Sequence, residues 1–122
     1  MSRDRGIRLQ NALARYLAGW WPSAESAGSG RPGTDVLGTP GIAWENKTAR
    51  EFRPAAWVKQ ARTHAGGGQL PVVAYWPDGV GESTPQAVMA IVPLPELVGL
   101  LIEAGYASDR PGMMRQIKEA LS

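Results

Sequence analysis

The sequence predicts one α/β domain in which a mixed β-sheet of about five strands is flanked by helices. Segments with apolar residues at helical spacing alternate with short apolar segments typical of strands. A chain of 122 residues with 43% hydrophobic residues fits a single core. Its 15 glycines and 10 prolines supply turns between these segments. We expect the domain to span residues 1–107, with residues 108–122 as a C-terminal tail or short helix.

The N-terminal part of the chain predicts a helix followed by a loop. Residues 7–20 place apolar side chains mostly at the spacings of an amphipathic helix. Pro22 ends this helix, because proline cannot continue the helical hydrogen bonding. Residues 23–33 read SAESAGSGRPG and predict a Gly/Ser-rich loop, with a short strand at 24–27.

A β-hairpin and a second helix are expected next. Residues 35–37 and 42–47 flank Gly38-Thr39-Pro40-Gly41, a sequence that favours a tight turn, so the two flanks are predicted to pair. Pro54 suits the first turn of a helix, and three glycines follow His64, so residues 54–64 are predicted to be helical.

The second half of the chain predicts two strands and a third helix. Residues 71–76 are almost continuously apolar, which is typical of a strand covered on both faces, and residues 87–92 are interpreted in the same way. Residues 94–104 predict a helix that begins near Pro95. Residues 113–121 predict a short amphipathic segment, either a loose tail or a dimer contact.

Composition excludes several classes of protein. Without cysteine the chain can form neither disulfides nor a Cys-ligated zinc site, and its single histidine excludes a His-rich site, so a bound metal would use oxygen ligands. No apolar run reaches the roughly 18 residues of a membrane span, and no signal peptide is recognisable. We therefore expect a soluble, cytoplasmic protein with no membrane association.

Charge is distributed unevenly along the chain. Residues 1–65 contain ten Lys and Arg against five Asp and Glu, whereas the remainder contains three against six. A basic half joined to an acidic half suggests a surface for a polyanion such as nucleic acid. The alternative is an ordinary solvated surface.

The hairpin carries a candidate site. Side chains alternate along a strand, so Glu45 and Lys47 are expected on one face while Trp44 and Asn46 lie on the other. Asp35 begins the neighbouring segment and can approach Glu45. Two carboxylates and an intervening backbone carbonyl suit Mg²⁺ or Mn²⁺, and a lysine can stabilise charge that develops on a phosphate. The alternative is a surface salt bridge beside a turn-forming aspartate.

These features resemble the PD-(D/E)xK nuclease superfamily, and more narrowly the Holliday junction resolvases of archaea and of actinobacterial phages. The resemblance covers roughly residues 5–106. The residues that carry it are Gly6, Leu9-Gln10, Ser26 to Gly30 with Arg31, Gly33-Thr34-Asp35, Trp44-Glu45-Asn46-Lys47, Gln60, Val72-Val73, Ala90 to Leu94 and the Leu-rich last helix.

The resemblance implies a restriction-endonuclease-like fold and a Mg²⁺-dependent phosphodiester hydrolase, in which Mn²⁺ can substitute. It also implies a homodimer that acts on branched DNA such as four-way junctions, in the host cytoplasm if the chain is phage-encoded. By the same resemblance Asp35 and Glu45 would be metal ligands, Lys47 the catalytic lysine, and Gln60 a residue beside the site that orients Lys47 or a phosphate.

One position departs from the family pattern. Resolvases of this kind usually have a glutamate on the first helix as a further metal ligand, and the matching residue here is Gln10. A neutral amide can still ligate through its oxygen, and Glu25 is an alternative ligand. Two other functions therefore stay open: a weak or inactive DNA-binding protein that keeps the fold, and a nuclease for another structured DNA.

Candidate DNA contacts surround the motif. Hydroxyl and cationic side chains bind phosphates, although a solvated surface explains them equally well. The residues are Arg8, Ser26, Ser29, Arg31, Arg50, Arg53, Lys59 and Arg62. Of the five tryptophans, Trp21 and Trp57 are candidates for exposed contacts with nucleic acid, and His64 is given no chemical role.

Overall fold

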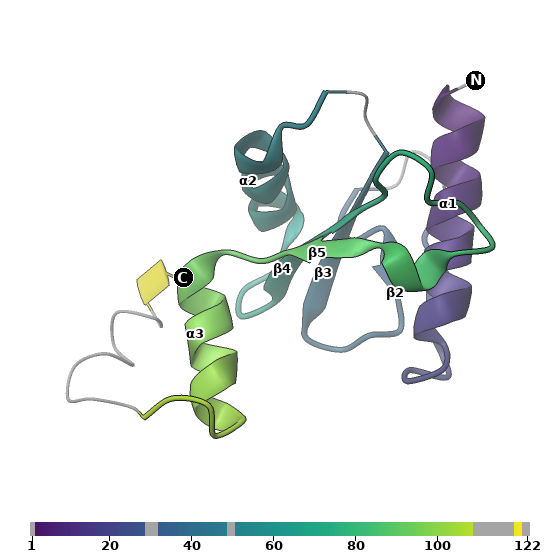
Figure 1. The fold of residues 1–122 in the computed structure, drawn as a ribbon. Coiled ribbons are helices and arrows are strands. Elements are labelled where there is room, and N and C mark those ends of the chain that lie inside the picture. Colours follow the sequence, from purple (N-terminus) through teal and green to yellow (C-terminus); the bar gives the residue numbers. More distant parts are fainter. Residues whose placement is uncertain (1, 29–31, 49–50, 109–118, 121–122) are drawn as a thin grey trace.

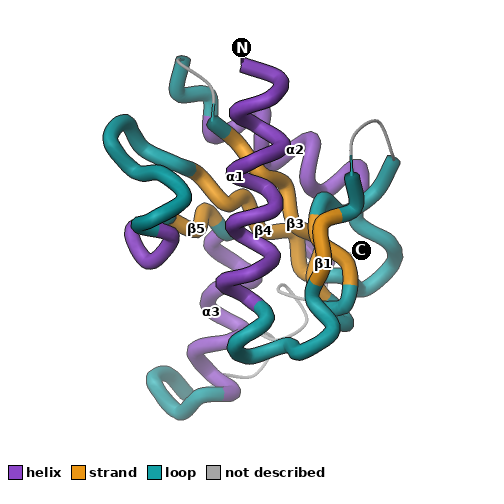
Figure 2. The backbone as a smooth tube through the Cα atoms, turned by 90° about the vertical axis from the view of Figure 1, so that its right-hand side faces the viewer, coloured by secondary structure: helices purple, strands orange, loops and turns teal. Residues whose placement is uncertain are grey.

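The computed structural model has an α/β fold, as the sequence predicted, and describes residues 2–28, 32–48, 51–108 and 119–120. A central sheet lies between helix α1 (Ser2–Leu17) and helix α2 (Pro54–His64), which cover opposite faces (Figures 1 and 2). The candidate residues of the hairpin motif therefore lie in the middle layer of a three-layer arrangement.

The central sheet has three strands, β3 (Ile42–Lys47), β4 (Leu70–Tyr75) and β5 (Met89–Ile91), in the order β3-β4-β5. Strand β4 runs parallel to β3 and antiparallel to β5. The short strands β1 (Glu25–Ser26) and β2 (Val36–Leu37) form a separate antiparallel pair. The expectation of one sheet of about five strands is therefore wrong, since the described strands form two small sheets.

The predicted hairpin is also wrong, because β2 pairs with β1 and β3 pairs with β4. Strands β2 and β3 approach each other closely where the Asp35 N–H donates to the Trp44 carbonyl at 2.8 Å. The neighbouring Trp44 N–H donates instead to the Thr34 hydroxyl at 2.8 Å. The Thr34 hydroxyl thus accepts the hydrogen bond that a backbone carbonyl of β2 would accept in a β-ladder. Threonine side chains often compete with the backbone in this way beside turns.

Alternate residues of β3 and β4 face the two helices. On the α1 side, Trp44 and Ala74 pack with Leu13 of the helix. On the α2 side, Val73 packs with Trp57 and Ala61 of α2, and Glu45 and Val73 are register partners on adjacent parallel strands. Glu45 and Lys47 therefore face α2, as the two-residue period requires.

Several predicted boundaries need correction. Helix α2 spans the predicted residues, but α1 ends at Leu17 and leaves Trp20 63% exposed in the following turn. Of the predicted strand at 87–92, only β5 is a strand, and its Met89 is 57% exposed. Ala87 is the last residue of a short 3-10 helix, η1 (Pro85–Ala87). Strand β5 is therefore an exposed edge strand. The predicted segment 113–121 lies largely outside the described residues.

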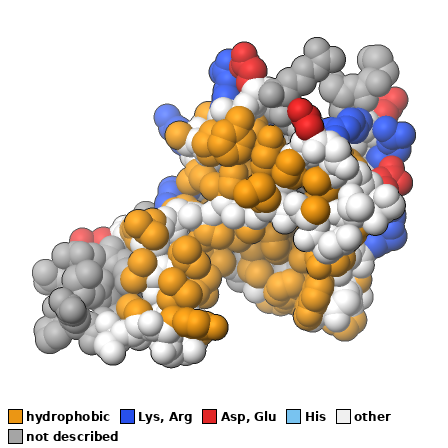
Figure 3. Space-filling model, viewed as in Figure 1, with side chains coloured by type: hydrophobic (Ala, Val, Ile, Leu, Met, Phe, Trp, Pro, Cys, Tyr) orange, Lys and Arg blue, Asp and Glu red, His pale blue; other side chains and the backbone are white. Residues whose placement is uncertain are grey.

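Helix α3 (Leu94–Glu103) stands away from the three layers (Figure 1). Apolar side chains cover much of its visible surface in Figure 3. Leu94, Leu97 and Leu100 of this helix are exposed. An ion pair of 2.7 Å between Arg62 of α2 and the buried Glu96 connects the two helices. Among the described residues, no helix combines the length and the apolarity that crossing a membrane requires.

Candidate active site

Asp35 lies at the edge of β3. Its carboxylate Oδ2 accepts a hydrogen bond of 2.7 Å from the backbone N–H of Asn46, and its own N–H is bound to Trp44. These two bonds fix both the backbone and the carboxylate of Asp35 against β3. Asp35, which was predicted to approach Glu45, is thus hydrogen-bonded to β3, the strand that contains Glu45.

Glu45 and Lys47 share the face of β3 that α2 covers. The Lys47 ammonium lies 3.4 Å from Glu45 Oε2, with the Glu45 side chain 6% exposed and that of Lys47 21% exposed. This contact confirms the predicted common face. It also differs from a surface salt bridge, because the glutamate is withdrawn from solvent.

His64, the last residue of α2, completes the set of charged and polar groups. Its Nδ1 lies 3.2 Å from Glu45 Oε1, and its side chain is 35% exposed. A carboxylate oxygen only accepts, so the contact is a hydrogen bond when Nδ1 carries the proton. The sequence interpretation missed this residue. Its one signal was helical spacing, because Trp57, Ala61 and His64 follow one another on one face of α2.

The pKa of Asp35 lies above its ordinary value. Burial of the carboxyl is the largest cause, and the nearby negative charge of Glu45 raises the pKa further. The hydrogen bond from Asn46 and the positive charges of Lys47 and His64 lower it. All four side chains of the candidate site therefore interact electrostatically, and the negative charge on Asp35 is incompletely compensated.

Asn46 fixes the orientation of β3. Its amide oxygen accepts a 2.7 Å hydrogen bond from the indole of Trp76, and its amide nitrogen donates to the Gly6 carbonyl of α1 at 3.3 Å. The Lys47 carbonyl accepts from Trp76 N–H on the β4 side, whereas the Trp44 carbonyl accepts from Asp35 on the other edge. Because carbonyls alternate along a strand, the Asn46 carbonyl points to the Asp35 edge.

The two predicted glutamines lie in different surroundings. Gln10 is buried, and its amide nitrogen donates to the Ser26 hydroxyl at 2.9 Å and to the Gly28 carbonyl at 3.4 Å. No hydrogen bond among the described residues connects Gln10 with Asp35 or Glu45. Gln60 is half-buried on α2, one turn before His64, and forms no hydrogen bond with another described side chain. The α2 residue that contacts Glu45 is His64.

Most predicted DNA contacts that the structure describes are already paired. Arg8 lies 3.7 Å from Glu82, Arg53 is paired with Glu51, and Ser26 holds Gln10. Arg62 binds Glu96 and donates to the Ala120 carbonyl at 2.6 Å, so it connects structural elements. Lys59 is exposed on α2. Ser29, Arg31 and Arg50 lie outside the described residues.

An exposed aromatic side chain adjoins the motif. Phe52 is 58% exposed, and its ring contacts the edge of Trp57 at 5.6 Å and Tyr75 at 5.0 Å between centroids. Tyr75 is the register partner of Lys47 on the adjacent strand. Trp57 is buried and Trp21 half-buried, so Phe52 is the aromatic residue that combines exposure with proximity to Lys47.

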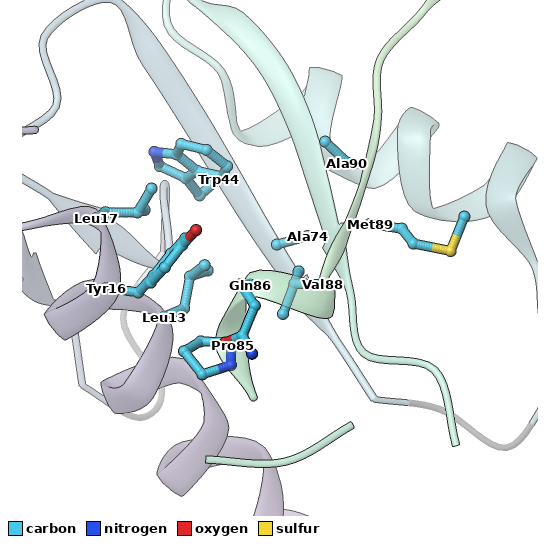
Figure 4. A pocket seen from close by; sticks show the side chains of 10 residues that line it. All are labelled: Leu13, Tyr16, Leu17, Trp44, Ala74, Pro85, Gln86, Val88, Met89 and Ala90. Atoms are coloured by element: carbon cyan, nitrogen blue, oxygen red, sulfur yellow. The ribbon is translucent and has the colours of Figure 1, made fainter. Parts of the chain in front are cut away.

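An apolar groove of about 200 Å³ lies on the other side of the sheet (Figure 4). Leu13, Tyr16 and Leu17 of α1 face Trp44 and Ala74 across it. None of its lining side chains is charged, and Trp44 points to the face opposite Glu45. The groove is therefore separate from the candidate active site.

The search for metal-binding groups among the described residues and the comparisons with known proteins both gave negative results. Within the described ranges, no group of three or more His, Asp and Glu side chains could hold a metal ion. Comparison of the chain with protein-family models, curated proteins and solved structures finds no match. The function must be inferred from the geometry around Asp35, Glu45, Lys47 and His64.

Proposed function

We propose that the protein is a divalent-metal-dependent DNA endonuclease with a restriction-endonuclease-like fold, acting on branched DNA in the manner of a Holliday junction resolvase. The supporting observation is that three charged groups come together around β3. Glu45 and Lys47 form an ion pair on the face that α2 covers, and a hydrogen bond to the Asn46 backbone holds Asp35 at the adjoining edge of the strand. Two acids and a lysine in a partly desolvated site form the set of groups that metal-assisted phosphodiester hydrolysis uses.

The donor set fits Mg²⁺, with Mn²⁺ as a substitute. Asp35 and Glu45 would hold the ion together with the Asn46 carbonyl, and water molecules would complete its coordination. Mg²⁺ typically binds proteins through one or two carboxylates and keeps several waters, so a third acidic or histidine ligand is unnecessary. The raised pKa of Asp35 supports this, because a cation would offset the repulsion from Glu45 and the cost of burial.

A bound ion would polarise the scissile phosphate and supply hydroxide from a bound water near neutral pH. Lys47 would stabilise negative charge that develops on the phosphate oxygens. Its position beside the buried Glu45 strengthens that effect, since electrostatic interactions weaken less where water is excluded. Gln60, one turn before His64, would contact the phosphate or Lys47.

The DNA would lie across the face that contains Lys47 and the start of α2. Lys59 offers an exposed charge for the phosphate backbone, and Phe52 offers a ring on which an unpaired base can stack. A base beside the scissile phosphate is free to stack at a junction or other discontinuity but not within a continuous duplex. The position of Phe52 next to Tyr75 therefore favours structured DNA.

A homodimer belongs to this proposal, because resolution of a four-way junction needs two cuts on opposing strands. The exposed leucines of α3 are the apolar surface that supports it. A helix with such a surface usually packs against another element, and the described chain leaves these leucines exposed.

The test is cleavage of labelled four-way junctions by the purified full chain with Mg²⁺, Mn²⁺ or EDTA. We expect metal-dependent nicking that favours junctions over linear duplex. Lys47→Ala should lower the rate by about 10²- to 10³-fold, the usual effect of removing one group that stabilises transition-state charge, while DNA binding persists. The matched variant Lys59→Ala should weaken binding and leave the rate on saturating DNA unchanged. Equal cleavage by wild type and Lys47→Ala would rule out this assignment.

A second candidate is a DNA-binding protein that kept the fold without catalysis. The structural observation in its favour is Gln10, whose amide is bound to Ser26 and Gly28. Titration of Mn²⁺ against thermal stability distinguishes the two candidates. A ligand that binds only the folded state stabilises it by about 2.7 kcal/mol at 100 times its Kd. Unchanged melting temperature at millimolar Mn²⁺ would favour the DNA-binding protein.

A further inference from the structure

We propose that His64 is a positioning residue that holds the Glu45 carboxylate in the orientation needed to bind the metal ion. The inference rests on the proposed function and extends it to a residue that the motif does not contain. It depends on one contact, from His64 Nδ1 to Glu45 Oε1 at 3.2 Å.

The two oxygens of Glu45 have different neighbours. Oε1 faces His64, and Oε2 lies 3.4 Å from the Lys47 ammonium. The imidazole ends a packed helix, whereas the Lys47 ammonium is carried by a flexible chain of four methylene groups, so Lys47 can leave Oε2 more easily than His64 can leave Oε1. With Oε1 held by His64, the ion would be taken by Oε2, and Lys47 would turn towards the phosphate.

Helix α2 places His64 where this bond requires it. Trp57 and Ala61 are buried against Val73, and His64 continues the same stripe of the helix towards Glu45. The helix ends at this residue, because Ala65 is extended and the Gly66 N–H donates to the Gln69 side chain at 2.6 Å. The packing of the helix therefore determines the reach of the imidazole.

Groups that bind a ligating side chain commonly control metal affinity. A ligating carboxylate needs its unliganded oxygen bound to a donor, and loss of such a partner typically lowers metal affinity about 10- to 100-fold. The imidazole also lies close enough to affect the charge on Asp35, so it belongs to the same electrostatic site. The hydrogen bond therefore places His64 next to the proposed ligand Glu45, where it can act without touching the substrate.

The experiment compares wild type, His64→Ala and His64→Asn as full-length, EDTA-treated proteins. The Asn amide nitrogen branches from the same carbon as the histidine Nδ1, so this variant can restore the donor. Apparent Kd values for Mg²⁺ and Mn²⁺ are obtained from the dependence of melting temperature on metal concentration. Thr63→Ala is the matched control, because Thr63 is exposed on the same turn and bonds only to the Lys59 carbonyl of its own helix.

We expect His64→Ala to weaken both ions about 10- to 100-fold, and His64→Asn to recover most of that loss. Unchanged Kd values in His64→Ala would overturn the inference, as would failure of a normally folded His64→Asn to recover affinity. A loss confined to Mn²⁺ would also overturn it, because it would identify the imidazole as a direct ligand. If His64→Ala does not fold, His64→Asn decides: near-wild-type Kd values support the inference, and a 10-fold loss contradicts it.

The two proposals fail in different ways. If wild type shows no metal-dependent stabilisation, the metal-dependent nuclease is wrong and the role of His64 falls with it. If wild type binds metal and cleaves junctions while His64→Ala does the same with equal affinity, only the role of His64 is wrong.

Discussion

The Asp35 carboxylate accepts a hydrogen bond from the Asn46 backbone at 2.7 Å, which attaches the residue before β2 to the strand between Glu45 and Lys47. The bond keeps Asp35 close to Glu45, although burial and the charge of Glu45 both raise the pKa of Asp35 and so disfavour its charged form. An arrangement that costs stability in the metal-free protein is typical of a functional site.

The first prediction concerns Asp35→Asn. The substitution keeps an oxygen that can accept from Asn46 and removes the charge that burial and Glu45 disfavour, so the metal-free variant should be more stable than wild type at neutral pH. Urea unfolding in EDTA measures this difference. In the same variant, stabilisation by Mn²⁺ should be lost. Asp78→Asn, which changes an exposed acid in the loop after β4, should alter neither property.

The effect of Asp35 should depend on pH with a definite sign. The pKa of Asp35 in the folded protein exceeds its ordinary value of 3.8, so the contribution of this carboxyl to stability is fully present below pH 3.8 and is lost as pH rises through the folded pKa. The gain in stability of Asp35→Asn over wild type should therefore increase as pH rises from 3.8 through the folded pKa of Asp35, and should remain constant above it. A variant that is less stable than wild type at neutral pH in EDTA would show that Lys47 and His64 compensate the charge fully.

The second prediction compares two glycines around the turn between β2 and β3. Gly38 and Gly41 have φ of +83° and +84°, so alanine at either position meets the same backbone strain of about 1–2 kcal/mol. A Cβ at Gly38 would also overlap the Ser23 carbonyl oxygen, whereas one at Gly41 would have no heavy atom of the described chain within 4 Å. Gly38→Ala should therefore cost clearly more stability than Gly41→Ala in urea unfolding. Equal losses of stability in the two variants would mean that the backbone around Ser23 can move to accommodate the Cβ at position 38.

The alternation of side chains along β3 could be predicted from the sequence, whereas the pairing of the strands could not. The alternation of Glu45 and Lys47 along β3 follows from the two-residue period, which needs no tertiary information. The partner of β2 could not be predicted, because it depends on side-chain hydrogen bonds. The Thr34 hydroxyl accepts from the Trp44 N–H in place of a backbone carbonyl, and the Ser26 hydroxyl of β1 accepts from Gln10 of α1. The contact between His64 and Glu45 could not be predicted, because it depends on where α2 packs on the sheet and only the fold determines that.

The third prediction concerns Phe52. Stacking of a base on an aromatic ring contributes about 1–3 kcal/mol, so Phe52→Leu should weaken binding of a labelled four-way junction roughly 5- to 100-fold in EDTA. Phe52→Trp should retain affinity. Trp20→Leu is the matched control, because Trp20 is 63% exposed and packs on Tyr16 at the other side of the sheet. Equal losses in the Phe52→Leu and Trp20→Leu variants would argue against a stacking site next to Lys47.

The fourth prediction concerns the exposed surface of α3. Leu94 and Leu97 are 69% and 38% exposed, and a stable subunit contact usually buries apolar side chains at its centre. We expect wild type to sediment as a dimer, and Leu94→Glu combined with Leu97→Glu to sediment as a monomer, since burying two carboxylates without partners is costly. The double variant should retain Mn²⁺-dependent stabilisation, because Asp35 and Glu45 lie outside α3.

Its control is Trp20→Glu, which places the same charge on an exposed apolar residue outside α3 and should leave the sedimentation coefficient unchanged. If wild type is monomeric at the concentrations used for cleavage, the proposal of a homodimer is wrong. The proposed phosphodiester hydrolysis would still be tested separately, by the cleavage assay. If the double variant still sediments as a dimer, the subunit contact lies outside the exposed leucines of α3. Paired cuts on opposing strands of a junction should then persist in that variant, whereas a monomeric variant should produce single nicks.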